Sequence, residues 1–271
     1  MKVAAIQMVS GVDMQVNLAQ AAALIAQAAQ AGAELAVLPE YFCLMGQSEQ
    51  DKLAMAERPG DGAVQRFLSE QARTHGLWLV GGTLPLVTSD QARVHNSALV
   101  FDPQGDCVAR YDKIHLFGFD TGAEHFDEAR TILPGSQPVR FVLKTRAGVD
   151  WRVGLSVCYD LRFPELYRAH ARSGCDLLLV PSAFTATTGR AHWEVLLRAR
   201  AIENQAYVLA AAQGGQHENG RRTWGQSMVV GPWGDVLAQQ AQGSAVVLAE
   251  LRQAHLQEVR RQLPALRHSV L

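Results

Sequence analysis

Short apolar segments alternate with helical segments along most of the chain, and this alternation limits the folds that the sequence can adopt. The expected strands are the apolar runs at 3–8, 34–40, 77–86, 176–184 and 206–213. The expected helices lie at 16–32, 61–75, 163–173 and 190–204. Antiparallel pairs are expected in hairpins at 96–113 and 139–157 and in two strands around the turn 231–236. Apolar strands that alternate with helices form sheets covered by helices, so the pattern predicts an α/β fold with mixed sheets.

The chain carries no sign of division into separate domains. No linker, low-complexity stretch or shift in composition interrupts it, so we expect one domain over residues 1–271. A chain of this length can bury a substantial core. The one long stretch without periodicity is 118–135, and a loop of that length inside a compact domain is more often functional than not.

Composition excludes several classes of partner. Hydrophobic residues make up 48% and charged residues 19% of the chain, which is typical of an ordinary globular protein. The net charge is −1, so the chain has no excess of positive charge with which to bind nucleic acid or anionic lipid. The sequence has no apolar run of the roughly 18 residues that a membrane span needs. Its four cysteines are widely spaced without a CxxC pair, which argues against a zinc site and favours a reducing, cytoplasmic compartment.

Three expected strands each end on a reactive side chain. These residues are Glu40, Lys113 and Cys158, an acid, an amine and a thiol. Ligands of α/β sheets bind beyond the carboxyl ends of strands, so the three side chains would form a nucleophilic site if they meet at one edge. Each also has a plainer interpretation, because Glu40 can be a solvated loop acid, Lys113 can pair with Asp112, and a lone cysteine usually fills a core.

Three sequence blocks decide between these interpretations. The blocks are LPEYF (38–42), YDKIHLF (111–117) and CYDLRFPELYR (158–168). Their order and residue types resemble those of the nitrilase superfamily of carbon–nitrogen hydrolases. The chain resembles this superfamily over nearly its whole length. The resemblance implies a four-layer α-β-β-α sandwich. It also implies a homodimer, which is the common assembly in that family.

The resemblance also implies a role for each strand-end residue. Glu40 corresponds to the general base, Lys113 to the stabiliser of the oxyanion and Cys158 to the nucleophile that forms a thioester. The backbone N–H of Tyr159 would be the second oxyanion donor. Such a reaction on a small-molecule amide needs no metal and no organic cofactor.

Many members of the superfamily have a second glutamate between the lysine and the cysteine. In this chain it falls in the loop 118–135, where Glu128 matches best and Glu124 is the alternative. The alternative for Glu128 itself is a solvated loop acid. We therefore expect Glu128 to hold the lysine and the substrate in place.

Two segments in the C-terminal half indicate which members of the superfamily the chain resembles most. The resemblance is greatest to two kinds of amidase that act on amides of a 2-oxo dicarboxylic acid. Residues 181–213 and 221–234 are more similar to the kind that cleaves deaminated glutathione than to ω-amidases. The resemblance thus implies hydrolysis of deaminated glutathione to 2-oxoglutarate and Cys-Gly. An ω-amidase that acts on 2-oxoglutaramate is the alternative, and a non-catalytic scaffold of the same fold is a third hypothesis.

The candidates for contacts with the acyl part of this substrate or its surroundings are Tyr159, Arg162, Thr187 and Thr188. Arg162 is either a ligand for a substrate carboxylate or the ion-pair partner of Glu165. Thr187 and Thr188 are expected in the loop after the strand at 176–180, where they would line the same pocket.

The mouth of the pocket is expected between two segments, the loop 118–135 and the polar run 213–222. Arg221 or Arg222 is a candidate to meet the carboxylate of the leaving dipeptide. The alternative for both arginines is a solvated basic turn.

Overall fold

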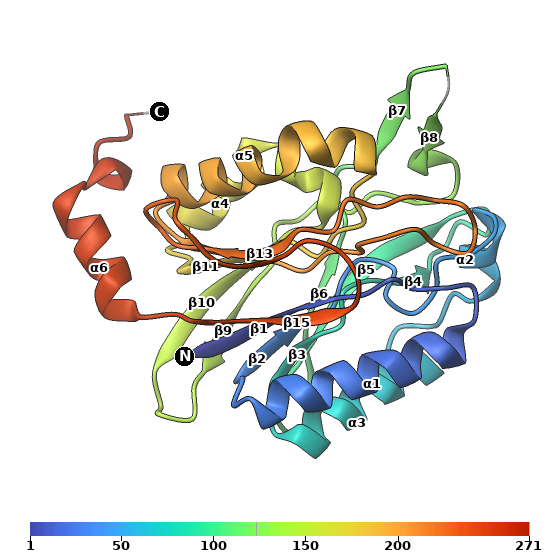
Figure 1. Cartoon of the computed structure of the whole chain (residues 1–271), viewed down its shortest axis with the longest axis horizontal. Helices are drawn as coiled ribbons and strands as arrows, with labels where there is room; N and C mark the ends of the chain where they lie inside the picture. Colours follow the sequence, from blue (N-terminus) through green and yellow to red (C-terminus); the bar gives the residue numbers. More distant parts are fainter. Residues whose placement is uncertain (123, 271) are drawn as a thin grey trace.

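Two β-sheets pack face to face between two layers of helices, which gives the four-layer α-β-β-α order (Figure 1). The structure is a computed structural model that describes residues 1–122 and 124–270. Ala123, inside the expected loop 118–135, and Leu271, at the end of the expected domain, lie outside the described residues. The predictions of an α/β fold and of its four-layer form are confirmed.

The first sheet has seven strands and includes the N-terminal strand. Across the sheet the strands are β15 (Ala245–Glu250), β1 (Lys2–Gln7), β2 (Leu35–Val37), β3 (Trp78–Val80), β5 (Val94–Phe101) and β4 (Leu84–Val87), with β6 (Cys107–Asp112) also paired to β5. Strands β1, β2 and β3 run parallel. Helices α1 (Met14–Gln30) and α3 (Ala63–His75) cover the outer face, and the short α2 (Gln50–Ala54) precedes α3 (Figure 1).

The second sheet has six strands in a simple order. These are β14 (Val236–Gln240), β13 (Ser227–Val230), β12 (Tyr207–Ala210), β11 (Leu177–Leu179), β10 (Asp150–Leu155) and β9 (Arg140–Lys144). Helices α4 (Pro164–Arg172) and α5 (Ala186–Asn204) cover its outer face (Figure 1). The remaining elements are the hairpin β7 (Gly118–Asp120) and β8 (His125–Asp127), the 3₁₀ turns η1 (Glu128–Arg130), η2 (Cys158–Arg162) and η3 (Ala265–Arg267), and α6 (Gln253–Gln262).

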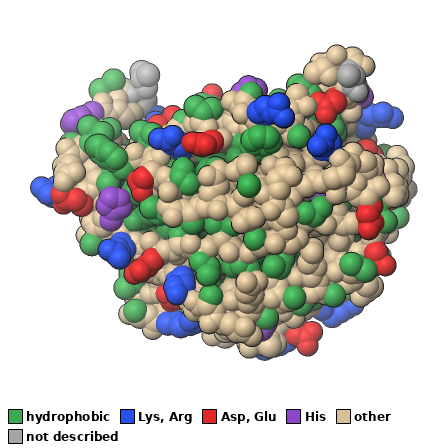
Figure 2. All heavy atoms as spheres, in the orientation of Figure 1, with side chains coloured by type: hydrophobic (Ala, Val, Ile, Leu, Met, Phe, Trp, Pro, Cys, Tyr) green, Lys and Arg blue, Asp and Glu red, His purple; other side chains and the backbone are tan. Residues whose placement is uncertain are grey.

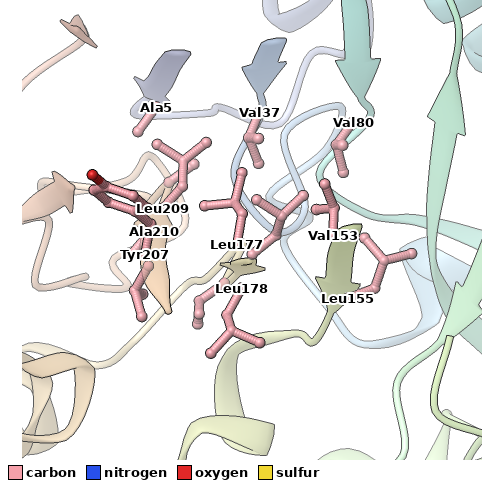
Figure 3. Packing of buried hydrophobic residues seen from close by; sticks show 14 of the residues in the cluster. Ala5, Val37, Val80, Val153, Leu155, Leu177, Leu178, Tyr207, Leu209 and Ala210 are labelled. Carbon is pink, nitrogen blue, oxygen red and sulfur yellow. The ribbon is translucent and has the colours of Figure 1, made fainter. Parts of the chain in front are cut away.

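The main core lies between the two sheets. Ala5, Val37 and Val80 of the first sheet point toward Val153 and Leu177 of the second, and all five are fully buried (Figure 3). Full burial of a valine or leucine side chain contributes about 1.5–3 kcal/mol, so this double layer of branched side chains fixes one sheet against the other. The loops that leave the two sheets are thereby held in a defined relative position.

The surface carries both signs of charge. Lysine, arginine, aspartate and glutamate side chains are interspersed on the face seen in Figure 2. Among the helices in the described ranges, none is both long and apolar enough to cross a membrane.

One expected strand is divided in two. The run 77–86 forms β3 and β4, and the chain turns between them at Gly82, whose φ is +51°. A Cβ at Gly82 would lie 2.0 Å from the carbonyl oxygen of Pro39, so only glycine allows this close approach. The break therefore lies directly beside the segment that carries Glu40.

The stretch 118–135 is not the irregular loop that its sequence suggests, because it contains the β7–β8 hairpin and η1. Phe119 and Phe126 pair across the hairpin, and the rings of both lie near Phe117. Aromatic cross-strand pairs stabilise short antiparallel strands. The β15 strand and α6 are further elements without a counterpart in the predicted pattern.

Candidate active site

A chamber of about 260 Å³ opens where strands of both sheets end, and its walls include Glu40, Lys113, Glu128 and Cys158. Glu40 follows β2 of the first sheet, and Lys113 directly follows β6. Cys158 follows β10 of the second sheet, and Glu128 begins η1 just after the β7–β8 hairpin. These four ionisable side chains thus reach the same cavity from four different segments.

Cys158 occupies a strained turn. Its φ is +50°, in the left-handed region that residues with a Cβ rarely adopt, and such strain is concentrated at functional sites. The turn is held because the Cys158 N–H donates to the Pro181 carbonyl at 2.9 Å. The next N–H, that of Tyr159, has no acceptor within the described residues. The thiol is 7% exposed and forms part of the chamber wall.

The Glu40 carboxylate is buried and bound on both oxygens. Its Oε1 accepts hydrogen bonds from Lys113 Nζ and from Asn96 Nδ2, both at 2.9 Å. Its Oε2 accepts from the Ala183 N–H at 2.9 Å. With a side-chain exposure of 2%, the carboxylate is oriented by the protein rather than by solvent.

Lys113 lies between two carboxylates. Its Nζ donates to Glu128 Oε2 at 2.7 Å as well as to Glu40, and its side chain is 1% exposed. Burial alone would lower the pKa of Lys113, but Glu128 and Glu40 outweigh burial and raise that pKa above its usual range. The lysine is therefore held as a cation.

Glu128 is fixed by neutral donors as well as by the lysine. The Tyr41 hydroxyl donates to its Oε1 at 2.6 Å and the Phe117 N–H to its Oε2 at 2.8 Å. Burial opposes ionisation, but Lys113 and Lys52 lower the pKa of Glu128 to about 2. The structure thus brings Glu128 to the lysine. Glu124, the alternative glutamate, is half-buried and instead accepts from the Thr187 hydroxyl at 2.8 Å.

The charges of the cluster favour a protonated thiol at rest. Two carboxylates surround one ammonium group, so a thiolate at Cys158 would add a second excess negative charge. Burial and the adjacent Glu40 raise the pKa of Cys158 well above its usual range, and Lys113 lowers it only in part. Transfer of the thiol proton to Glu40 leaves the total charge unchanged, and it is therefore the route to a thiolate that costs least in this dry site.

Asp160 links the turn that contains Cys158 to the segment that follows Lys113. Its Oδ2 accepts from the Val157 N–H at 2.8 Å and from the Tyr111 hydroxyl at 2.7 Å. Its Oδ1 accepts from the His115 N–H at 3.0 Å, with the ring Nδ1 at 2.7 Å. The carboxylate is fully buried, and these bonds fix the two segments relative to each other.

Arg162 and Tyr159 both line the chamber. The Arg162 guanidinium lies over the Phe184 ring at 5.3 Å and near His192 Nδ1 at 3.2 Å. Within the described residues it forms no ion pair with Glu165, which was one of the two expectations for it. Its charge is therefore free to meet an anionic group in the chamber.

The two threonines lie in different places. Both belong to the first turn of α5, so the prediction that they lie in a loop is wrong. The helix begins earlier than expected because Thr185 caps it, accepting from the Thr188 N–H at 3.2 Å. Thr188 lines the chamber, whereas Thr187 faces a neighbouring cleft and lies outside the chamber.

Sequence reasoning missed Tyr41, Asn96 and Ala183 as neighbours of the charged cluster. Tyr41 lies inside the LPEYF block and, with φ at +56°, has a strained backbone like Cys158. Asn96 is the middle one of three polar residues, His95 to Ser97, near the start of β5, so the sequence pattern does not single it out. Ala183 contributes only its N–H, and no side-chain pattern indicates such a donor.

The described residues contain no group of three or more histidine, cysteine, aspartate or glutamate side chains placed to hold a metal ion.

Comparison with known proteins shows the family to which the chain belongs. The model of the carbon–nitrogen hydrolase family matches residues 2–261, so the chain belongs to this family. It is a hydrolase of the amidase type that acts on carbon–nitrogen bonds. The resemblance to the nitrilase superfamily is confirmed.

Individual relatives add detail. A deaminated glutathione amidase from Yersinia enterocolitica is 40% identical over 98% of this chain and 92% of the relative. An omega-amidase from Pongo abelii is 38% identical over 93% of this chain and 88% of the relative. The crystal structure of the C. elegans NitFhit protein matches with a TM-score of 0.90 and 38% identity, covering 99% of this chain and 65% of that one.

Proposed function

We propose that the protein hydrolyses the amide bond of deaminated glutathione to 2-oxoglutarate and Cys-Gly, with Cys158 as the nucleophile. The observation that carries this proposal is the buried cluster of Glu40, Lys113 and Glu128 in the chamber that Cys158 lines. The similarity to deaminated glutathione amidases over 98% of the chain supports the choice of substrate.

In the first half of the reaction, Glu40 takes the thiol proton and the Cys158 sulfur attacks the amide carbon. Negative charge then develops on the carbonyl oxygen. We assign its stabilisation to the Lys113 ammonium and to the Tyr159 N–H, which has no other acceptor within the described residues. Removal of one such donor typically costs about 10²–10³ in rate.

In the second half, Glu40 gives the proton to the departing nitrogen as the carbon–nitrogen bond breaks, and Cys-Gly leaves. A water molecule then gives a proton to Glu40 and attacks the thioester. The carbon–sulfur bond breaks, 2-oxoglutarate leaves, and the proton on Glu40 returns to the Cys158 sulfur. Glu128 is the positioning residue in this scheme, because its contact with Lys113 at 2.7 Å fixes the ammonium beside Glu40.

The chamber and its surroundings fit a two-part substrate. At about 260 Å³ the chamber itself suits the 2-oxo acid, with Arg162 and Thr188 as candidates for its carboxylate. A larger cleft of about 1080 Å³ adjoins the chamber and shares Tyr41, Phe126 and Arg221 with it. The leaving dipeptide would extend into this cleft.

Turnover of 2-oxoglutaramate is the second candidate, because the relative from Pongo abelii is named an omega-amidase. That substrate expels ammonia and needs the inner chamber alone. A scaffold without catalysis has no physical need for a buried lysine between two carboxylates, since each buried charge carries a desolvation cost.

The test compares the two oxo-amides in one assay, because both release 2-oxoglutarate. We expect kcat/KM for deaminated glutathione to exceed that for 2-oxoglutaramate by at least about tenfold, which needs only about 1.4 kcal/mol of transition-state binding. Glutathione, with an ammonium group in place of the ketone, should be almost inert. The reverse order would make the protein an ω-amidase, and comparable turnover of simple nitriles would refute both assignments.

The proposal extends to organisation and compartment. We propose one catalytic domain per chain, a homodimer and a cytoplasmic location. The apolar side chains of Val195 and Ile202 on α5 are 61% and 48% exposed, which supports burial of this face between two copies. Free thiols at all four cysteines are typical of a reducing compartment. Sedimentation analysis of the purified protein tests the assembly.

A further inference from the structure

Two arginines stand side by side on the wall of the outer cleft. Arg190 and Arg222 both line it, and both are exposed. The Arg222 carbonyl accepts the Ala186 N–H at 3.1 Å. Arg190 is four residues beyond Ala186 on α5, and residues four apart share one face of a helix. The two guanidinium groups therefore rise from neighbouring points of the same wall.

Neither arginine is neutralised by the protein. Within the described residues, neither side chain forms an ion pair with a carboxylate. Four basic side chains line the cleft against two acids, and one of these acids, Glu49, pairs with Lys52. The cleft thus holds an excess of positive charge at its outer wall.

The cleft is continuous with the chamber that contains the nucleophile. Tyr41, Lys52, Phe126 and Arg221 line both cavities. Arg221 itself is committed to the wall, since its guanidinium donates to the Ala183 carbonyl at 3.0 Å and lies over the Phe126 ring at 5.4 Å. A substrate whose acyl group fills the chamber has this junction as a path for its leaving group.

We propose that Arg190 and Arg222 form a subsite for a carboxylate at the far end of the leaving amine. The enzyme would then select amides whose leaving group is a small peptide acid over amides that release ammonia or a neutral amine. This inference rests on the proposed function, which supplies the 2-oxo acyl group in the chamber. It adds a discriminating charge contact outside the catalytic cluster.

The experiment varies the substrate and the protein together. Three substrates share the 2-oxoglutaryl group: deaminated glutathione, its glycine carboxamide and 2-oxoglutaramate. They are compared on the wild type, on the Arg190→Gln/Arg222→Gln double variant and on Arg152→Gln. Arg152 is an exposed arginine that lines a separate hollow with Asp176, so it is the matched control.

We expect the wild type to prefer the acid to its carboxamide by roughly threefold to tenfold in kcat/KM, the range of two solvent-exposed ion pairs. The double variant should lose this preference, and Arg152→Gln should retain it. The wild-type preference should also shrink as salt is raised from about 0.05 to 0.5 M, because exposed charges are screened.

The outcomes separate the two proposals. Equal turnover of acid and carboxamide by the wild type, or a preference that survives in the double variant, overturns the subsite while leaving the proposed function intact. Failure of the wild type to release 2-oxoglutarate from any of the three substrates overturns the proposed function, and the subsite with it. The comparison of acid and carboxamide on the wild type needs no variant to fold.

Discussion

Replacement of Glu128 by glutamine tests the charge balance of the buried cluster. Glutamine keeps the shape of the side chain and an oxygen that can accept from Lys113, but it removes the negative charge. The pKa of Glu128 falls from its ordinary value of 4.5 to about 2 in the folded protein. A difference of about 2.5 units corresponds to about 3 kcal/mol of stability at neutral pH.

The sign of the pH dependence follows from the direction of this shift. Above pH 4.5 the carboxylate is ionised in both the folded and the unfolded chain, so its full stabilising effect is present. As the pH falls from 4.5 toward 2, the unfolded chain binds a proton before the folded chain does, and the stabilising effect is lost. The wild type should therefore exceed Glu128→Gln in stability by about 3 kcal/mol at pH 7 and by much less near pH 2.5.

The assay is urea unfolding of the wild type and the variant at pH 7 and at the lowest pH where both stay folded. Glu124→Gln is the matched control, because Glu124 is the other glutamate of the same segment and is only half-buried. We expect this control to stay within about 0.5 kcal/mol of the wild type at both pH values. Equal pH dependence in the wild type and in Glu128→Gln would refute the charge argument. In activity, Glu128→Gln should lose about 10- to 100-fold in kcat, since the hydrogen bond from Lys113 then ends on a neutral oxygen and loses its charge assistance.

Further predictions concern the proposed nucleophile, base and oxyanion donor. Cys158→Ala should abolish turnover with the fold intact. The control Cys107→Ala, at an exposed thiol of β6, should turn over like the wild type. A Cys158→Ala rate above about a tenth of the wild-type rate would refute the covalent mechanism. Cys158→Ser should be nearly as inactive, because a carboxylate is a weak base for an alcohol. Glu40→Gln and Lys113→Ala should each lose about 10² or more in kcat, and the double variant should be little worse than either, while strictly additive losses would contradict a single catalytic unit. Lys113→Ala should also lower the melting temperature more than Glu40→Gln does, because it leaves two buried carboxylates without a cation.

Much of the fold could be predicted because strands and helices here have distinct periodicities. The helix expected at 61–75 forms α3 over Ala63–His75, and the hairpin expected at 96–113 forms β5 and β6. What could not be predicted depends on contacts distant in sequence. β15 is a strand because Ala249 pairs with Val3 at the other end of the chain, and no local pattern encodes that pairing.

The candidate site likewise has residues that the sequence could predict and residues that it could not. Glu40, Lys113 and Cys158 were visible because each places a reactive group at the end of an expected strand, within a block that resembles the family. Their neighbour Asn96 was not, because its amide reaches Glu40 only through the pairing of β4 and β5 beside the break at Gly82. Backbone donors such as the Ala183 N–H leave no trace in side-chain patterns at all.

Glu40 and Cys158 lie on loops that leave different sheets, so the distance between the two side chains depends on how the sheets pack against each other. The proposed mechanism moves a proton between these two groups. Their separation is set by the distance between β2 and β10, and hence by the volume of the side chains between the sheets. Residues such as Val37 and Leu177 lie in the core between the sheets and not in the chamber wall, yet a change in their size would shift Glu40 and Cys158 relative to each other. Selection for turnover therefore acts on the interior of this protein as well as on its pocket.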